Sequence, residues 1–272
     1  MFLLVFSEFF LLKLKLSDLS NTCVLITRPE GQAGTLKDLL ESRGATVEIQ
    51  PAIAILPPDS WVDADEAIER LNEYLYVVFS SVNGVTMFLN RLTALGRGVD
   101  ELKRCTVAAV GSTTAKELER RGVDVKLVPE EFRAENLASA ICADLSSRGQ
   151  AQREAAKALL LRASRGRDIL QKQLESAGVK TTQVVVYKSE DVLSPKPEIA
   201  EKLKSGAIDF VALTSSAIAQ STINMFGDLL RNTKIVCISP ITAQTVEKNG
   251  FSVDAVAEPY TMEGLVEAII KQ

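Results

Sequence analysis

Residues 106–141 read TVAAVGSTTAKELERRGVDVKLVPEEFRAENLASAI. The stretch opens with the apolar run 107–110, which is typical of a strand buried on both faces. A Gly-Ser-Thr-Thr turn follows, and then an amphipathic run that ends at Gly122, a residue type common just after the last turn of a helix. Strand, hydroxyl-rich turn and helix together present unpaired backbone N–H groups at a helix N-terminus. The sequence therefore predicts an anion-binding loop here.

The same order of elements returns near the C-terminus. Residues 235–269 read IVCISPITAQTVEKNGFSVDAVAEPYTMEGLVEAI, and Ile235 follows Val107 by 128 residues. Two further stretches recur with an offset of 134, since residues 25–44 match 159–178 and residues 77–85 match 211–219. A repeat of this length predicts two similar domains rather than a solenoid of short units.

Length and charge limit the possible partners. A chain of 272 residues can form two domains with cores of their own. The net charge of −4 disfavours nucleic acid, which usually meets a basic surface, so we expect no nucleic-acid partner. An anionic ligand must then be held by local groups rather than by the field of the whole protein.

The residue types that are missing exclude several kinds of site. Histidine is absent, which excludes Ser-His-Asp and Cys-His catalysis and His-based metal sites. The sequence has neither G-x-G-x-x-G nor a Walker A motif, so we expect no nucleotide and predict no cofactor and no metal. Without a C-x-x-C pair, the four cysteines are predicted to be buried thiols in a reducing compartment; they are Cys23, Cys105, Cys142 and Cys237.

The N-terminal residues 1–20 are predicted to be an extension before the first strand. The first twelve are apolar except Ser7 and Glu8, too few for the roughly 20 residues of a membrane-spanning helix. A basic n-region and a cleavage site are missing, which disfavours a signal peptide. We expect a cytoplasmic protein with no membrane partner; a helix lying on a membrane surface is the alternative.

Strands and helices alternate along the rest of the chain, which predicts an α/β fold with parallel sheets covered by helices. The β-prone run 46–55 is interrupted by Pro51, and a proline there favours an edge strand or a connection. The run 183–187, QVVVY, has the same character and leads into a second proline-containing segment. We interpret the two runs as crossings between the domains.

Ligands of such sheets bind at the carboxyl ends of the strands. The loops expected there are rich in Ser and Thr, and Arg28 is the cation among them; they are residues 27–29, 80–81, 111–114, 214–216 and 239–242. Any one of these hydroxyls could simply cap a helix. Five at equivalent strand ends favour a shared binding cleft.

Two other features suggest chemistry at the strand ends. Tyr187 ends the run QVVVY, where a phenol can donate a proton or a hydrogen bond, or simply pack at an interface. Arg162, Arg165 and Arg167 follow a strand end and could meet carboxylates, with solvated surface arginines as the alternative.

In its ordered set of motifs the chain resembles the uroporphyrinogen-III synthase family. The resemblance covers residues 23–270, and no single motif is diagnostic. The matching pieces are ITRPEGQAGTLKDLLESRGATVEIQPAI, VVFSSVNGV, VAAVGSTTAKEL, VPEEFRAENLASAI, LLLRASRGRDILQKQLESAG, VVVYKSE, ALTSSAIAQ and VAEPYTMEGLVEAI.

The resemblance implies two flavodoxin-like domains joined by a two-stranded β-connection. One domain would comprise residues 21–51 and 190–272 and the other 58–182, with residues 52–57 and 183–189 as the connection. The implied activity is that of a lyase of tetrapyrrole biosynthesis, which cyclises hydroxymethylbilane to uroporphyrinogen III with inversion of ring D and loss of water. The protein would be a monomer, in transient contact with hydroxymethylbilane synthase.

The resemblance also implies roles for individual residues. Tyr187 would help the ring-A hydroxyl leave as water, while hydroxyls and backbone N–H groups meet the substrate carboxylates. The implied substrate-binding residues are Thr27, Arg28, Ser80, Ser81, Gly111, Ser112, Thr114, Thr214, Ser215, Ser216 and Thr242. Ser239 replaces the glycine usual in the second glycine loop, which would matter if that position required positive φ or a close backbone approach.

Three other functions fit part of the pattern. A bilobal binding protein or sensor would have the same two lobes and two crossings. A nucleotide-sugar transferase with twin lobes would need an acidic metal or diphosphate site, and none is apparent. The third is a regulatory or degenerate homologue of the synthase, which Ser239 slightly favours.

Overall fold

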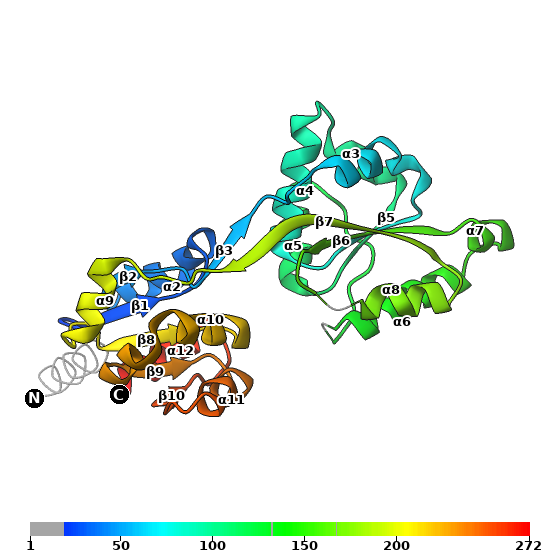
Figure 1. Ribbon diagram of the computed structural model, residues 1–272. Coiled ribbons are helices and arrows are strands. Elements are labelled where there is room, and N and C mark those ends of the chain that lie inside the picture. Colours follow the sequence, from blue (N-terminus) through cyan, green and yellow to red (C-terminus); the bar gives the residue numbers. More distant parts are fainter. Residues whose placement is uncertain (1–18, 132, 167) are drawn as a thin grey trace, which may run out of the picture. The chain divides into compact units, whose positions relative to one another are not determined.

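The computed structural model describes residues 19–131, 133–166 and 168–272 (Figure 1). Nearly all of the expected N-terminal extension, together with Arg167, lies outside the described residues. The chain forms two compact units. Unit 1 contains the residues up to Ala54 and those from Glu190 to Gln272, and unit 2 contains Ile55–Ser189.

Unit 1 is built on a five-stranded sheet of order β10-β9-β8-β1-β2. Its strands are β1 (Cys23–Ile26), β2 (Thr46–Ile49), β8 (Phe210–Leu213), β9 (Lys234–Cys237) and β10 (Ala255–Val256). Each neighbouring pair is parallel. Counted along the chain within this unit the order is 2-1-3-4-5, which is the flavodoxin-like order.

Helices cover both faces of this sheet. The helices α2 (Glu30–Glu41) and α12 (Met262–Ile270) contact each other and share a core with Val24 and Ile26 of β1. The remaining helices of the unit are α9 (Pro197–Lys204), α10 (Ser216–Phe226) and α11 (Pro240–Lys248). Val24, Leu25 and Ile26 are all fully buried, which is why the strand reads as a continuous apolar run.

Unit 2 is built on a sheet of order β3-β7-β6-β4-β5. The strands are β3 (Ile53–Leu56), β4 (Tyr76–Phe79), β5 (Thr106–Ala109), β6 (Lys157–Ala163) and β7 (Lys180–Asp191). The helices are α3 (Val62–Glu69), α4 (Val82–Ala94), α5 (Ser112–Arg120), α6 (Ala134–Ser146), α7 (Gln150–Glu154) and α8 (Ile169–Ser176). Alternate residues of β4 face two cores, Val77 toward Phe88 of α4 and Val78 toward Ile141 of α6.

The sequence repeat is present in the register of the two sheets. In unit 1 Val24 lies opposite Phe210, and in unit 2 Ala158 lies opposite Tyr76. The residues of one pair are each 134 positions from their counterparts in the other. The pairing of Ala255 with Val236 likewise corresponds, at an offset of 128, to the bridge between Leu127 and Ala108. The α/β fold with two sheets of mainly parallel strands is therefore confirmed.

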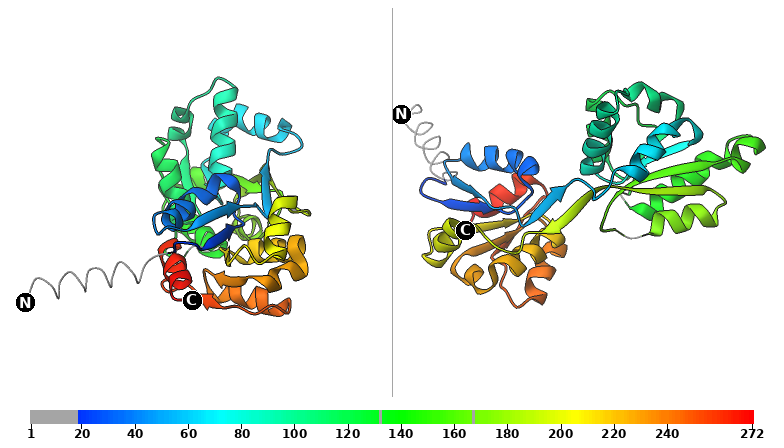
Figure 2. Two further views of the ribbon diagram at one scale, coloured as in Figure 1. Left: turned by 90° about the vertical axis from the view of Figure 1, so that its left-hand side faces the viewer. Right: turned by 45° about the horizontal axis from the view of Figure 1, so that its top comes forward.

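Some elements differ from their predicted extents. The run 46–55 is split into β2 and β3, because after Pro51 the Ala52 N–H donates to the Thr27 carbonyl (2.9 Å) and the chain leaves the first sheet. The helix α3 ends at Glu69 and is followed by the 3₁₀ turn Leu71–Glu73 rather than by further α-helix. The strand predicted over 183–187 extends to twelve residues as β7. β3 and β7 are neighbours, side by side in Figures 1 and 2, and carry the chain from unit 1 into unit 2 and back.

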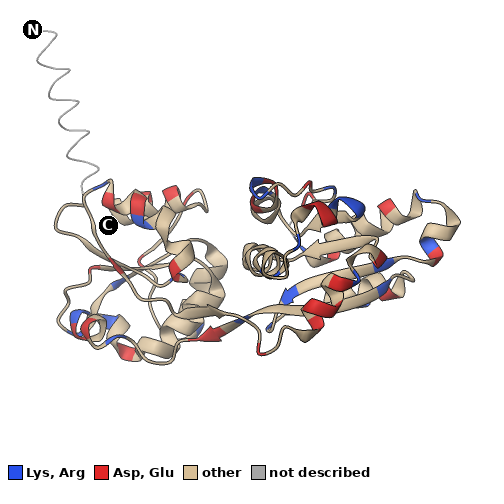
Figure 3. Ribbon diagram, turned by 90° about the horizontal axis from the view of Figure 1, so that it is seen from above, with Lys and Arg blue, Asp and Glu red and all other residues tan. Residues whose placement is uncertain are grey.

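Acidic and basic residues are interspersed on the helices of each unit (Figure 3). Many of them form ion pairs one helical turn apart, such as Arg121 with Glu117 (2.6 Å). Across the described ranges, no helix has the length and apolar character needed to cross a membrane. All four cysteines are free. The prediction of burial is correct for Cys105 and Cys237, whereas Cys23, at the start of its strand, and Cys142 are partly exposed.

Candidate functional site

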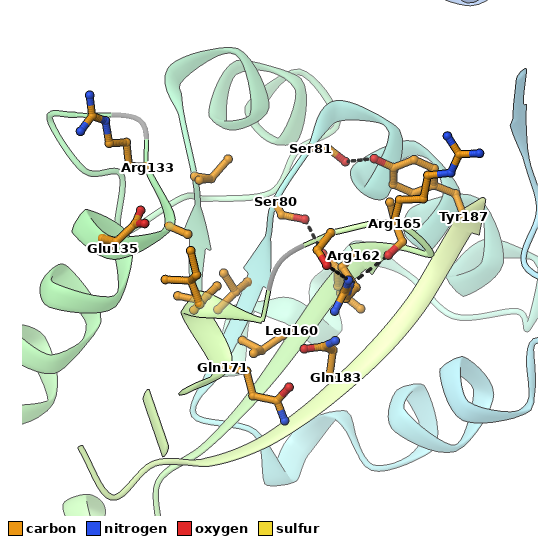
Figure 4. A pocket seen from close by; sticks show the side chains of 18 residues that line it. Ser80, Ser81, Arg133, Glu135, Leu160, Arg162, Arg165, Gln171, Gln183 and Tyr187 are labelled. Carbon is orange, nitrogen blue, oxygen red and sulfur yellow. Dashed lines mark hydrogen bonds between the residues drawn. The ribbon is translucent and has the colours of Figure 1, made fainter. Parts of the chain in front are cut away.

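A cavity of about 580 Å³ lies in unit 2 at the carboxyl ends of β4 and β6, beside the middle of β7 (Figure 4). This is the edge at which parallel α/β sheets bind ligands, and the volume suits a sizeable organic molecule. Its polar walls include Ser80 and Ser81 after β4, Arg162 and Arg165 at and after the end of β6, and Tyr187 on β7.

An irregularity in β7 turns Tyr187 inward. Arg162 pairs with Val185, but the next residue, Ala163, pairs with Tyr187, so Val186 is an extra residue in the ladder. A bulge of this kind re-aims the side chains that follow it. Val186 and Tyr187 consequently both belong to the core of unit 2, although consecutive residues of a regular strand point to opposite faces. The tyrosine is only 7% exposed, yet it contributes to the cavity wall.

The Tyr187 hydroxyl lies 3.0 Å from Oγ of Ser81 (Figure 4). Ser81 is the N-cap of α4, and its Oγ accepts the backbone N–H of Gly84 at 3.0 Å. A Cβ at position 84 would lie 3.3 Å from that Oγ and 3.9 Å from the tyrosine ring. The glycine therefore leaves room for the ring against the first turn of the helix.

Arginines surround the cavity, but Arg162 is already engaged. Its guanidinium forms an ion pair with Asp168 (2.5 Å) and donates to the carbonyls of Gly166 (2.7 Å) and Ala163 (3.0 Å). This guanidinium lowers the pKa of the Asp168 carboxyl. Arg162 thus stabilises the loop after β6, and its charge is already paired with a carboxylate. Arg165 lies at the cavity as well, and Arg167 is outside the described residues.

Sequence reasoning missed four polar residues of the cavity, Arg133, Glu135, Gln171 and Gln183. Arg133 is the N-cap residue of α6, and Gln183 lies on β7. Arg133 precedes the last helix of the stretch 106–141, and the recurrence of that stretch at 235–269 was the signal that could have pointed to it.

Of the residues predicted in unit 2, Ser80, Ser81 and Tyr187 share the cavity. Ser80 Oγ donates to the carbonyl of Leu161 (2.9 Å), which fixes the end of β4 against β6. Gly111 is the N-cap residue of α5, and Ser112 and Thr114 lie in the first turn of that helix. These three residues do not line the cavity.

The residues predicted in unit 1 lie at the ends of its strands. Thr27 follows β1 and Thr214 follows β8; both are buried, and the hydroxyl of each lacks a hydrogen-bond partner within the described structure. Ser215 caps α10 by accepting the N–H of Ile218 (3.2 Å). Ser216 Oγ donates to the carbonyl of Ile241 (3.2 Å).

Arg28 is half-buried beside these residues. Its Nε donates to the carbonyl of Gln32 (3.0 Å), and one terminal nitrogen lies 3.9 Å from the sulfur of Met262. No carboxylate in the described part of the chain forms an ion pair with it, and burial lowers the pKa of the guanidinium. A half-buried arginine without a counter-ion can accept an anion.

Ser239 keeps the backbone conformation of the glycine loop. Its φ and ψ are −157° and 161°, close to the −163° and 168° of Gly111 at the equivalent place in unit 2. The position therefore does not need positive φ. The serine caps α11 by accepting the N–H of Thr242 (3.4 Å), and Thr242 is buried.

Comparisons with known proteins give one consistent result. The family described as uroporphyrinogen-III synthase HemD matches residues 34–267. The uroporphyrinogen-III synthase of Synechococcus elongatus is 27% identical over 90% of this chain and 93% of that protein. The porphyrin biosynthesis protein HemD of Ruminiclostridium josui is 26% identical over 93% of this chain, which spans about half (49%) of that longer protein.

A solved structure has the same fold. It is a mutant uroporphyrinogen III synthase from the extremely thermophilic bacterium Thermus thermophilus, with a TM-score of 0.59 and 18% identity. The alignment covers 92% of this chain and all of that one.

Proposed function

The chain belongs to the uroporphyrinogen-III synthase family, and we propose on this basis that it cyclises hydroxymethylbilane to uroporphyrinogen III. Enzymes of the family are cyclising lyases of tetrapyrrole biosynthesis. Besides family membership, the main structural support for this activity is the hydroxyl of Tyr187, which lies at the wall of the unit 2 cavity within hydrogen-bond distance of Ser81. A hydroxyl placed there can act as the proton donor that the first step requires.

The reaction begins with loss of the ring-A hydroxyl group. The carbon–oxygen bond breaks, its electron pair leaves with the oxygen, and the Tyr187 proton converts the departing hydroxide to water. The pyrrole nitrogen supplies the electron density that the carbon loses, so the products are an azafulvenium, water and the Tyr187 phenolate. A positioned acid of this kind needs to lie within hydrogen-bond reach of the leaving group.

Ring D then attacks the electrophilic carbon through its substituted position, which gives a spiro intermediate. Fragmentation and re-closure invert the ring, and the proton lost on rearomatisation restores the neutral tyrosine. The unrearranged isomer forms spontaneously, so the main task of the protein is to hold the chain in the geometry that favours attack by this carbon.

We propose that the strand-end loops bind the substrate carboxylates. In unit 1 the supporting features are the unpartnered hydroxyls of Thr27 and Thr214 and the half-buried Arg28. In unit 2 they are the cavity residues Ser80 and Arg165. The remaining proposed binding residues are Gly111, Ser112, Thr114, Ser215, Ser216 and Thr242, through hydroxyls or backbone N–H groups at helix N-termini, and Ser81, through its backbone N–H alone.

An isomer assay tests the function. Hydroxymethylbilane is generated in situ, incubated with the purified protein and oxidised, and the uroporphyrin isomers are separated. Predominantly isomer III supports cyclisation with inversion of ring D. Isomer I alone, at the spontaneous rate, refutes the activity and leaves a non-catalytic homologue.

We further propose a monomer in the cytoplasm that receives its substrate by transient contact with hydroxymethylbilane synthase. The four free cysteines support a reducing compartment. Size-exclusion chromatography with light scattering tests the monomer.

A further inference from the structure

We propose that Ser81 is a positioning residue for Tyr187: its hydroxyl directs the tyrosine proton into the cavity and stabilises the phenolate formed when that proton is given away. The inference rests on the function proposed above and assigns the tyrosine a partner. It is carried by the hydrogen-bond geometry, by the comparison of the two units and by the bulge in β7.

The hydrogen-bond capacity of Ser81 is the first observation. A serine hydroxyl has one proton to donate and two lone pairs, and the Gly84 N–H uses one lone pair. If Tyr187 donated to Ser81, its proton would be used in that hydrogen bond and would not be available to a ligand. If Ser81 donates, the tyrosine proton remains for a ligand. A phenolate can only accept, so after proton transfer the donor must be Ser81.

The position of Ser81 on α4 strengthens this role. The N-terminus of a helix carries a partial positive charge that favours a nearby anion within the first turn. Ser81 is the N-cap residue of this 13-residue helix, and its Oγ connects the N–H of Gly84 to the phenol oxygen. A negative charge on Tyr187 is thereby placed next to the favourable end of the helix.

Unit 1 provides an internal comparison. Ser215 is the residue 134 positions after Ser81, with nearly the same backbone angles (−167°, 160° against −165°, 157°), and it caps α10 in the same way. However, Ile218 stands where unit 2 has Gly84, and Ile53 stands where it has Tyr187. Capping a helix therefore requires neither the glycine nor the tyrosine.

The bulge belongs to the same arrangement. If β7 were a regular strand through Val186, Tyr187 would point to the same face as the exposed Val185. The bulge, the small residue at position 84 and the capping serine together bring the two hydroxyl oxygens to 3.0 Å.

The substitution Ser81→Gly separates the proposed role from capping. Glycine is a good N-cap residue, and Gly111 already occupies the equivalent position before α5. The variant should lose about tenfold in kcat with KM unchanged, since a hydrogen bond to a charged group in the transition state is lost. Ser81→Thr, which keeps the hydroxyl, should restore most of the turnover. Ser215→Gly is the matched control for stability, because it removes the same kind of cap without touching a tyrosine.

A double-mutant cycle with Tyr187→Phe tests whether the loss of kcat in Ser81→Gly acts through Tyr187. In the phenylalanine background Ser81→Gly should cause no further loss of kcat. Three results would overturn the inference: an undiminished kcat in Ser81→Gly, an equal loss in both backgrounds, or a raised KM with kcat unchanged. The last would show that the Ser81 hydroxyl binds substrate directly.

A spectroscopic measurement keeps the inference separate from the proposed function. The tyrosine Fermi doublet in ultraviolet resonance Raman spectra distinguishes a phenol that accepts a hydrogen bond from one that donates. Subtracting the Tyr187→Phe spectrum isolates Tyr187, which should show the acceptor ratio in the wild type and lose it in Ser81→Gly. A donor ratio would overturn the assignment even with full activity. If the wild type made only isomer I, the function would fail, and this spectrum would still decide the hydrogen bond.

Discussion

Gly264 occupies a place in unit 1 where a single methyl group should be destabilising. It is the third residue of α12, and a Cβ built there would lie 1.9 Å from the carbonyl oxygen of Pro259. Such atoms essentially never approach within 3.0 Å of another group, so the backbone must move by about 1 Å. The same carbonyl accepts the N–H of Thr261 (2.8 Å), whose side chain in turn caps the helix at the N–H of Gly264 (3.1 Å).

The magnitude follows from these contacts. Overpacking of this kind costs about 2 kcal/mol, and disturbing the cap costs about 1 kcal/mol more. Alanine gains about 1 kcal/mol over glycine in a helix, so Gly264→Ala should lower the free energy of unfolding by about 2 kcal/mol. Gly34→Ala in α2 is the matched control, because nothing lies within 4 Å of its added Cβ. That variant should be more stable by up to about 1 kcal/mol.

Urea unfolding measures both changes. Far-UV circular dichroism reports helices of both units, while the fluorescence of Trp61, the only tryptophan, reports unit 2. The Gly264→Ala transition should move to lower urea in circular dichroism. A Gly264→Ala protein as stable as the parent, or a destabilised Gly34→Ala, would refute the reasoning.

Four further measurements follow from the structure. Tyr187→Phe should keep measurable formation of isomer III at a turnover lowered by about 100-fold, the low end for a general acid; wild-type turnover would exclude the acid role. Gly84→Ala should lower kcat several-fold with little change in thermal stability, because its methyl group displaces the Ser81 hydroxyl; unchanged kcat would contradict the tight fit. Hydrogen bonding to Arg120 and Arg121 lowers the pKa of Glu117 to about 2 from 4.5, so its stabilisation is complete above pH 4.5 and disappears as the pH falls toward 2. Glu117→Gln should therefore cost about 1 kcal/mol at neutral pH and progressively less as the pH falls toward 2, and a difference independent of pH would contradict this. Burial raises the pKa of the Cys105 and Cys237 thiols to about 11 and about 12, so a thiol reagent at pH 8 should label them only after unfolding. Labelling of either thiol in the native protein, detected by mass spectrometry, would contradict this.

The strands and the repeat could be predicted from the sequence because their cause is local. A strand buried on both faces must be apolar at every position, and residues 24–26 and 210–213 show this directly. The offset of 134 then placed equivalent loops at equivalent strand ends. The fold class followed from the alternation of strands and helices.

The cavity could not be predicted in the same way, because it depends on contacts distant in sequence. The contact between Tyr187 and Ser81 joins residues 106 positions apart and requires a bulge that QVVVY does not reveal. The run RASRGRD contains three arginines that were equal candidates for binding a carboxylate of the ligand, but in the structure Arg162 forms an ion pair with Asp168. Exposure of Cys142 depends on which side of α6 faces the sheet, and that is decided by packing.

The two sequence repeats and the two folded units do not coincide, and this has a consequence for biosynthesis. Unit 1 combines the first half of one repeat with the second half of the other, and unit 2 takes the two remaining halves. The arrangement is that of an exchange of arms between two fused copies. During translation unit 2 is complete once β7 has emerged, whereas β1 must wait for β8 before its inner edge is paired. Unit 1, which contains the first strand of the chain, is therefore the last to complete its sheet.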